Sequence, residues 1–181
     1  MSIIKPVKPT LAMVLAFCNP SASHHKLDAR LLTLAEPGKN LLSPWYVQVP
    51  SEIGDEQPYI AAAKHAHKLL INEDRISSLR KQALIWTSFL PLGITESETH
   101  VIRIFALSRI VDIDEIRVWS DRITLVPLDE VEQYQSRWNL NAWLALNTIL
   151  RSPTLELILE NSDLVEKSRM ATVQQHQQAI Q

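Results

Sequence analysis

The chain has 181 residues, 46% of them hydrophobic and 21% charged, and a formal net charge of -2. This composition is typical of a folded globular domain and excludes a largely disordered chain. No apolar run reaches the length of about 18 residues that a transmembrane helix needs. The charge provides no overall field that would draw the chain to nucleic acid. The three glycines are too far apart for a phosphate-binding glycine loop.

Residues 10–18 form a continuous apolar run that permits two interpretations. Residues 1–23 resemble an export signal, because lysines precede the run and small residues follow it, but two prolines interrupt the leader. A buried strand over 10–18 is the prediction we favour. The lone Cys18 cannot form an internal disulfide, so we expect a cytoplasmic protein. A nucleophilic Cys18 served by His24 or His25 is the alternative to a buried apolar thiol.

The next segments predict helices and a strand in alternation. A helix is expected from Ser23 to about Glu36, because leucines recur at spacings of four and three. Residues 45–49 predict a short strand between prolines. Residues 59–71 predict an alanine-rich helix, and Asn72 begins a second helix or continues the first with a kink.

Residues 115–126 predict a β-hairpin, because two alternating runs flank Ser120 and Asp121. In this register Ile116 lies opposite Leu125, and one face of the hairpin is apolar. Residues 100–110 predict a longer strand beside it.

The C-terminal third predicts helices. Asp129 begins one that reaches Trp138, a second covers 141–151, and a third follows Pro153. Residues 154–160 also alternate, so a strand is the competing interpretation there. The resulting division is an α+β core over 1–127, a helical extension packed on it over 128–167, and a flexible glutamine-rich tail over 168–181.

We therefore predict an α+β fold with a small, mostly antiparallel sheet, helices on one side and a helical C-terminal extension. Helices between the early strands leave a three-layer α/β arrangement as the alternative.

The polar face of the predicted hairpin is the first candidate site. It carries Arg117, Trp119, Arg122 and Thr124, with Trp119 and Arg122 paired across the strands. Tryptophan and arginine are frequent interface anchors, so this face predicts a protein partner or a second copy of the chain. Stacking on a nucleobase is a second interpretation, and burial of Trp119 beneath the C-terminal helices is a third.

An acidic turn is the second candidate site. Asp112, Asp114 and Glu115 could bind a divalent ion or act as general acids. A solvated turn is the simpler interpretation. His65 and His67 are two residues apart on a helix, so they project about 200° from each other and do not predict a shared metal ion. We expect neither cofactor nor metal.

The leading functional hypothesis is a non-enzymatic cytoplasmic accessory or regulatory protein that acts through a protein interface, because no catalytic motif is present. The first alternative is a small metal-dependent hydrolase or nuclease that uses the acidic turn at 112–115. The second is a nucleic-acid-binding protein that uses the 115–126 hairpin face. No partner in a membrane is expected.

Overall fold

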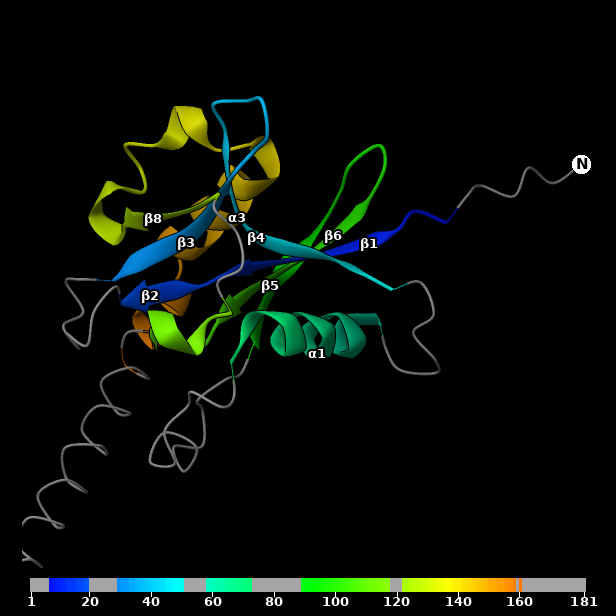
Figure 1. Cartoon of the computed structure of the whole chain (residues 1–181), viewed down its shortest axis with the longest axis horizontal. Helices are drawn as coiled ribbons and strands as arrows, with labels where there is room; N and C mark the ends of the chain where they lie inside the picture. Colours follow the sequence, from blue (N-terminus) through cyan, green and yellow to red (C-terminus); the bar gives the residue numbers. More distant parts are fainter. Residues whose placement is uncertain are drawn as a thin grey trace, which may run out of the picture.

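The described chain is organised around one large β-sheet. A computed structural model describes residues 7–19, 29–50, 58–72, 89–117, 122–158 and 160. Its strands are β1 (Thr10–Leu15), β2 (Phe17–Asn19), β3 (Arg30–Ala35), β4 (Leu42–Val49), β5 (Phe89–Glu96), β6 (Val101–Leu107), β7 (Val111–Asp112) and β8 (Ile123–Pro127), and its helices are α1 (Pro58–Leu70) and α3 (Leu140–Leu150). Seven of the eight described strands follow the order β5-β6-β1-β4-β3-β2-β7, and β8 pairs with β3 outside this order (Figure 1).

The central strand β1 has one antiparallel and one parallel neighbour. Met13 lies opposite Tyr46 of β4 in the antiparallel pair and opposite Ile104 of β6 in the parallel pair. The pairing of β2 with β7 is also parallel. The α+β class is therefore retained, but the sheet is larger than expected and mixed, because two of the seven pairings among its described strands are parallel.

Both faces of β1 are covered. Successive residues of a strand point to opposite faces, and Ala12 and Val14 join the apolar cluster that contains α1. Met13 and Leu15 join the cluster that contains buried residues of α3. Figure 1 shows α1 along one side of the sheet, with α3 behind the strands on the other. Helices thus cover both sides of the sheet, not one side as expected.

The helix expected from Ser23 to Glu36 is wrong over residues 29–36, the part of it that the structure describes, because none of these residues is helical. Residues 30–35 form β3, which lies between β4 and β2. Leu31 belongs to the cluster on the α3 face and Leu32 to the cluster on the α1 face. A strand buried on both faces reads as a continuous apolar run, whose leucines also fit a helical spacing.

The pairing predicted for the 115–126 hairpin is also wrong. Ile116 forms an isolated antiparallel bridge with Ile71, at the end of α1. Leu125 instead lies opposite Leu32, because β8 pairs along β3. The alternating pattern identified strand-like segments, but it did not identify their partners.

The remaining predictions for the described elements are largely confirmed. Strands occur within 10–18, 45–49 and 100–110, α1 matches the helix expected at 59–71, and α3 matches the one at 141–151. Residues 153–158 are helical, which favours the helix over the strand there. The helix expected from Asp129 to Trp138 is replaced by turns and two short 3-10 segments. In the part of the chain that the structure describes, no helix is long and apolar enough to span a bilayer.

Candidate ligand-binding site

A pocket of about 450 Å³ lies between α1 and the start of β5. The helix packs on the sheet through Ala62, Ala66 and Leu70, which are fully buried. Residues on the neighbouring edge of the same helix are left to line the pocket. Its lining consists of Tyr59, Ile60, Ala63, Lys64 and His67 of α1 and Phe89 of β5.

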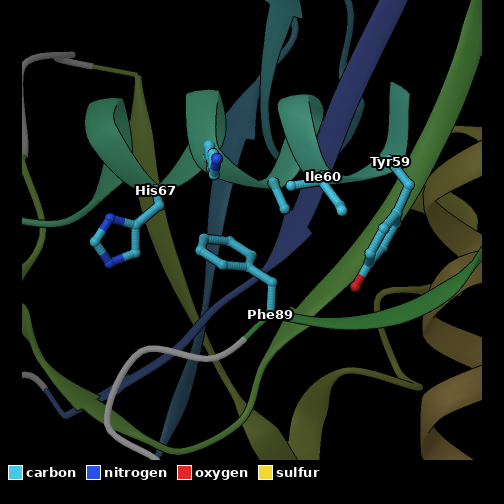
Figure 2. A pocket seen from close by; sticks show the side chains of 6 residues that line it. Tyr59, Ile60, His67 and Phe89 are labelled. Atoms are coloured by element: carbon cyan, nitrogen blue, oxygen red, sulfur yellow. The ribbon is translucent and has the colours of Figure 1, made fainter. Parts of the chain in front are cut away.

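Aromatic rings form one wall of this pocket and are held by mutual contacts. Tyr59 and Phe89 both pack on the fully buried Phe105, with ring centroids 5.5 Å and 6.1 Å away. His67 meets Phe89 edge-on at 5.9 Å. Figure 2 shows Phe89 below the middle of the helix, between Tyr59 and His67. The rings are therefore positioned in advance to contact a flat, partly apolar ligand.

The helix gives the pocket a cationic character. Its sequence contains Lys64, His65, His67 and Lys68 and no carboxylate. Of these residues, Lys64 and His67 line the pocket. An ammonium group and an imidazole beside aromatic rings favour a ligand that combines a ring system with an anionic group.

A second pocket of about 400 Å³ lies next to the first, because Tyr59 lines both. It is formed by β5 and β6 and contains Arg103. The Nε atom of Arg103 is buried and has no hydrogen-bond partner among the described residues.

The acidic turn lies at the far end of α1. Its backbone is tied to the helix, because the Asn72 amide donates to the Glu115 carbonyl at 2.6 Å and the Arg117 amide donates to the Leu70 carbonyl at 2.8 Å. The Glu115 carboxylate is buried and accepts a hydrogen bond from Arg109 at 2.8 Å. The Glu115 carboxylate is therefore already engaged in a structural ion pair with Arg109.

A resident metal ion does not fit the described residues. Asp112 is half-buried on β7, and the Asp114 side chain lies outside the description. No three His, Cys, Asp or Glu side chains within the described ranges come together as a metal-binding group. The use of Asp112, Asp114 and Glu115 as a site stays a prediction.

Cys18 is fully buried on β2. Burial raises the pKa of its thiol strongly, and the nearby carboxylates of Glu115 and Asp112 raise it further. The neutral thiol is inert as a nucleophile. His24 and His25, considered as its bases, lie outside the described residues.

The structure describes three of the four residues of the predicted hairpin face. Arg117, Arg122 and Thr124 are exposed, and Thr124 lies on β8. Trp119 lies outside the described residues, so the proposed pairing with Arg122 stays a prediction. The sequence analysis missed Tyr59, Phe89 and Arg103 as site residues. The recurrence of Tyr59, Ala63 and His67 at a spacing of four on a basic helix was the available signal for the first pocket.

Comparison with known proteins identifies the fold. No family model and no curated protein matches the sequence. The solved NUDIX domain of Shewanella oneidensis NrtR, complexed with ADP ribose, is similar with a TM-score of 0.50 and 9% identity, over 83% of this chain and 91% of that one. A NUDIX family hydrolase from Clostridium perfringens has a TM-score of 0.47 at 11% identity, over 79% and 97% of the two chains. The C-terminal domain of mouse MUTYH, in complex with human PCNA, has 0.46 at 9%, over 80% and 88%.

These similarities correct the leading functional hypothesis. The fold is like that of the NUDIX domain of NrtR. The expectation of a non-enzymatic accessory or regulatory protein is therefore wrong, and the hydrolase alternative fits the comparisons better.

Proposed function

We propose that the protein is a hydrolase that acts on a nucleotide derivative held in the pocket between α1 and β5. The likeness to a NUDIX domain that was solved with ADP ribose carries this proposal. The pocket supports it, because aromatic rings and cationic side chains lie together in one hollow of about 450 Å³. ADP-ribose combines a stacking base with a diphosphate, so it matches both features and is the first substrate to test.

Each lining group has a role in this proposal. Tyr59 and Phe89 stack against the nucleobase, since every base offers a π-face. Lys64 neutralises the diphosphate as a point charge. The proposal is supported by Tyr59 and Lys64, which line the same pocket from one helix, α1.

His67 is the proposed general base. It is the one lining residue whose side chain ordinarily titrates near neutral pH. A water oxygen attacks phosphorus, His67 accepts the water proton, and the bond from that phosphorus to the bridging oxygen breaks. The electron pair of the broken bond stays on the leaving phosphate. From ADP-ribose and water, the products are AMP and ribose 5-phosphate.

The test compares His67→Gln with His65→Gln, a matched change on the same helix outside the pocket lining. Products from ADP-ribose are separated by anion-exchange chromatography, with magnesium or EDTA in parallel reactions. We expect His67→Gln to lower kcat about 100-fold or more with little change in ADP-ribose binding, and His65→Gln to retain activity. Equal activity in all three proteins would remove His67 from the mechanism. Absence of both binding and products in the wild type would overturn the proposed function.

We place this activity in the cytoplasm, where a single unpaired cysteine needs no disulfide partner. A protein partner on the face with Arg117, Arg122 and Thr124 is a separate proposal. Size-exclusion chromatography of wild type and Trp119→Ala tests whether that face joins two copies of the chain.

A further inference from the structure

The half-buried Arg103 carries a donor that has no hydrogen-bond partner among the described residues. It lies on β6, on the same face as Phe105, and lines the second pocket together with Tyr59. Its Nε atom is buried without a hydrogen-bond partner in the described chain. Buried donors are normally satisfied, and leaving one unpaired costs free energy. An anionic ligand group in the pocket around this side chain would satisfy the donor.

The two pockets meet at Tyr59 and are together called the groove. Tyr59 lines both and packs on Phe105 at 5.5 Å. At the other end of α1, His67 packs on Phe89. The helix therefore runs beside β6 in the direction from Phe105 toward Leu107, because Phe89 lies opposite Leu107 in the sheet.

Arg103 and Lys64 lie on opposite sides of Tyr59 in this groove. Arg103 precedes Phe105 by two strand positions, about 7 Å along β6. Lys64 follows Tyr59 by five helical positions, about 7.5 Å along α1. Along the shared direction of α1 and β6, the two backbone positions are thus about 15 Å apart, and both side chains are long. One nucleotide derivative can contact both charges.

We propose that Arg103 forms a second anion subsite, which selects nucleotide derivatives that carry a further phosphate besides their diphosphate. The inference rests on the proposed function, because it assumes that the base and diphosphate occupy the first pocket. A guanidinium group binds phosphate through parallel hydrogen bonds, and the apolar neighbours Ile104 and Phe105 strengthen such contacts. The free Nε–H supplies one of these donors.

The experiment compares two ligands that differ by one phosphate, ADP-ribose and 2′-phospho-ADP-ribose. Calorimetry measures both affinities for the wild type and for Arg103→Gln, Arg103→Lys and Arg30→Gln, the last an exposed arginine of β3 outside both pockets. Circular dichroism verifies each fold. We expect the wild type to bind the phosphorylated ligand about tenfold more tightly or better. Arg103→Gln loses this preference and retains its affinity for ADP-ribose, Arg103→Lys recovers part of the preference, and Arg30→Gln behaves as the wild type.

A nitrogen–proton correlation spectrum of the arginine side chains gives a second readout. The Arg103 Nε–H signal is assigned by its loss in Arg103→Gln, and we expect it to shift saturably with 2′-phospho-ADP-ribose. Equal wild-type affinities with no response of this signal would overturn the subsite and leave the proposed function standing. If neither nucleotide binds, the proposed function fails, and titration with inorganic pyrophosphate decides the subsite. A saturable shift of the Arg103 signal supports it, and an unchanged signal overturns it.

Discussion

The cationic edge of α1 and the acidic turn after β7 carry their charges in opposite ways. Lys64 is exposed beside a pocket. Glu115 is 2% exposed and forms an ion pair with Arg109, which is 1% exposed. The first region therefore presents its charge at the surface beside a pocket, whereas the second holds its charge in an ion pair buried within the fold. The contrast teaches that a chemically suitable residue type becomes a site only when its exposure and its existing contacts allow it.

The largest expected effect comes from breaking the buried ion pair. Glu115→Gln leaves the Arg109 guanidinium charged and buried without its carboxylate, so we expect unfolding free energy to fall by about 3–5 kcal/mol. Urea denaturation measures the change. The double variant Arg109→Met, Glu115→Leu removes both charges and is expected to recover most of that loss. A single variant as stable as the wild type would mean that the pair contributes no structural constraint.

Removing an aromatic side chain tests the pocket between α1 and β5. Phe89→Ala deletes one stacking surface of the first pocket, so we expect ADP-ribose affinity to fall about 10- to 100-fold, as for loss of one base-stacking contact. Calorimetry measures it. Leu144→Ala, an exposed leucine of α3 on the opposite face of the sheet, is the control. Equal loss in both variants would place the ligand outside this pocket.

The surroundings of Cys18 predict a pH-dependent stability. The folded protein holds the thiol proton above the pH at which the unfolded chain releases it, because burial and nearby carboxylates raise the thiol pKa. This contribution is therefore complete below about pH 8.5 and falls by about 1.4 kcal/mol per pH unit above it. Urea denaturation of wild type and Cys18→Ala from pH 7 to pH 10 measures the difference. If unfolding free energy changed with pH in the same way in both proteins, the raised thiol pKa of Cys18 would be contradicted.

The smallest effect on stability is expected at Lys64. Lys64→Gln changes an exposed side chain, so unfolding free energy should stay within about 0.5 kcal/mol of the wild type. Its affinity for ADP-ribose should fall and become less sensitive to added salt, because one charge contact is lost. Lys68→Gln is the matched control on the same helix, outside the pocket lining. Identical losses in the two variants would indicate a general helix charge, not a contact at Lys64.

The sequence predicted the elements whose pattern is local. The apolar run at 10–18 and the alanine-rich helix at 59–71 carry their own signals, and both were confirmed. β3 was mistaken for a helix, because its leucines fit a helical spacing as well as a buried strand. Its burial on both faces depends on strands that are distant in the sequence, so no local pattern reveals it. The partner of β8 was missed for a related reason. Alternation identifies a strand face, but pairing is decided by the rest of the sheet.

The candidate site was harder to predict than the fold. His67 was recognised on the predicted helix at 59–71, but Phe89 joins it only through the register of β5 on β6. Arg103 reaches the same groove through that register and the packing of Tyr59 on Phe105. The acidic turn attracted attention by composition, yet its carboxylate at Glu115 is taken by Arg109, six residues earlier in the chain.

The contact between β3 and β8 has a consequence for synthesis of the chain on the ribosome. The Thr33 hydroxyl donates to the Thr124 carbonyl at 2.7 Å across a sequence separation of 91 residues. At about 5–20 residues per second, β3 emerges roughly 5–20 s before its partner exists. Its apolar residues, including the fully buried Leu31 and Leu32, are exposed to other chains during that interval. The nascent protein is therefore most vulnerable to aggregation before β8 is made, and chaperone binding at β3 would protect it during that period.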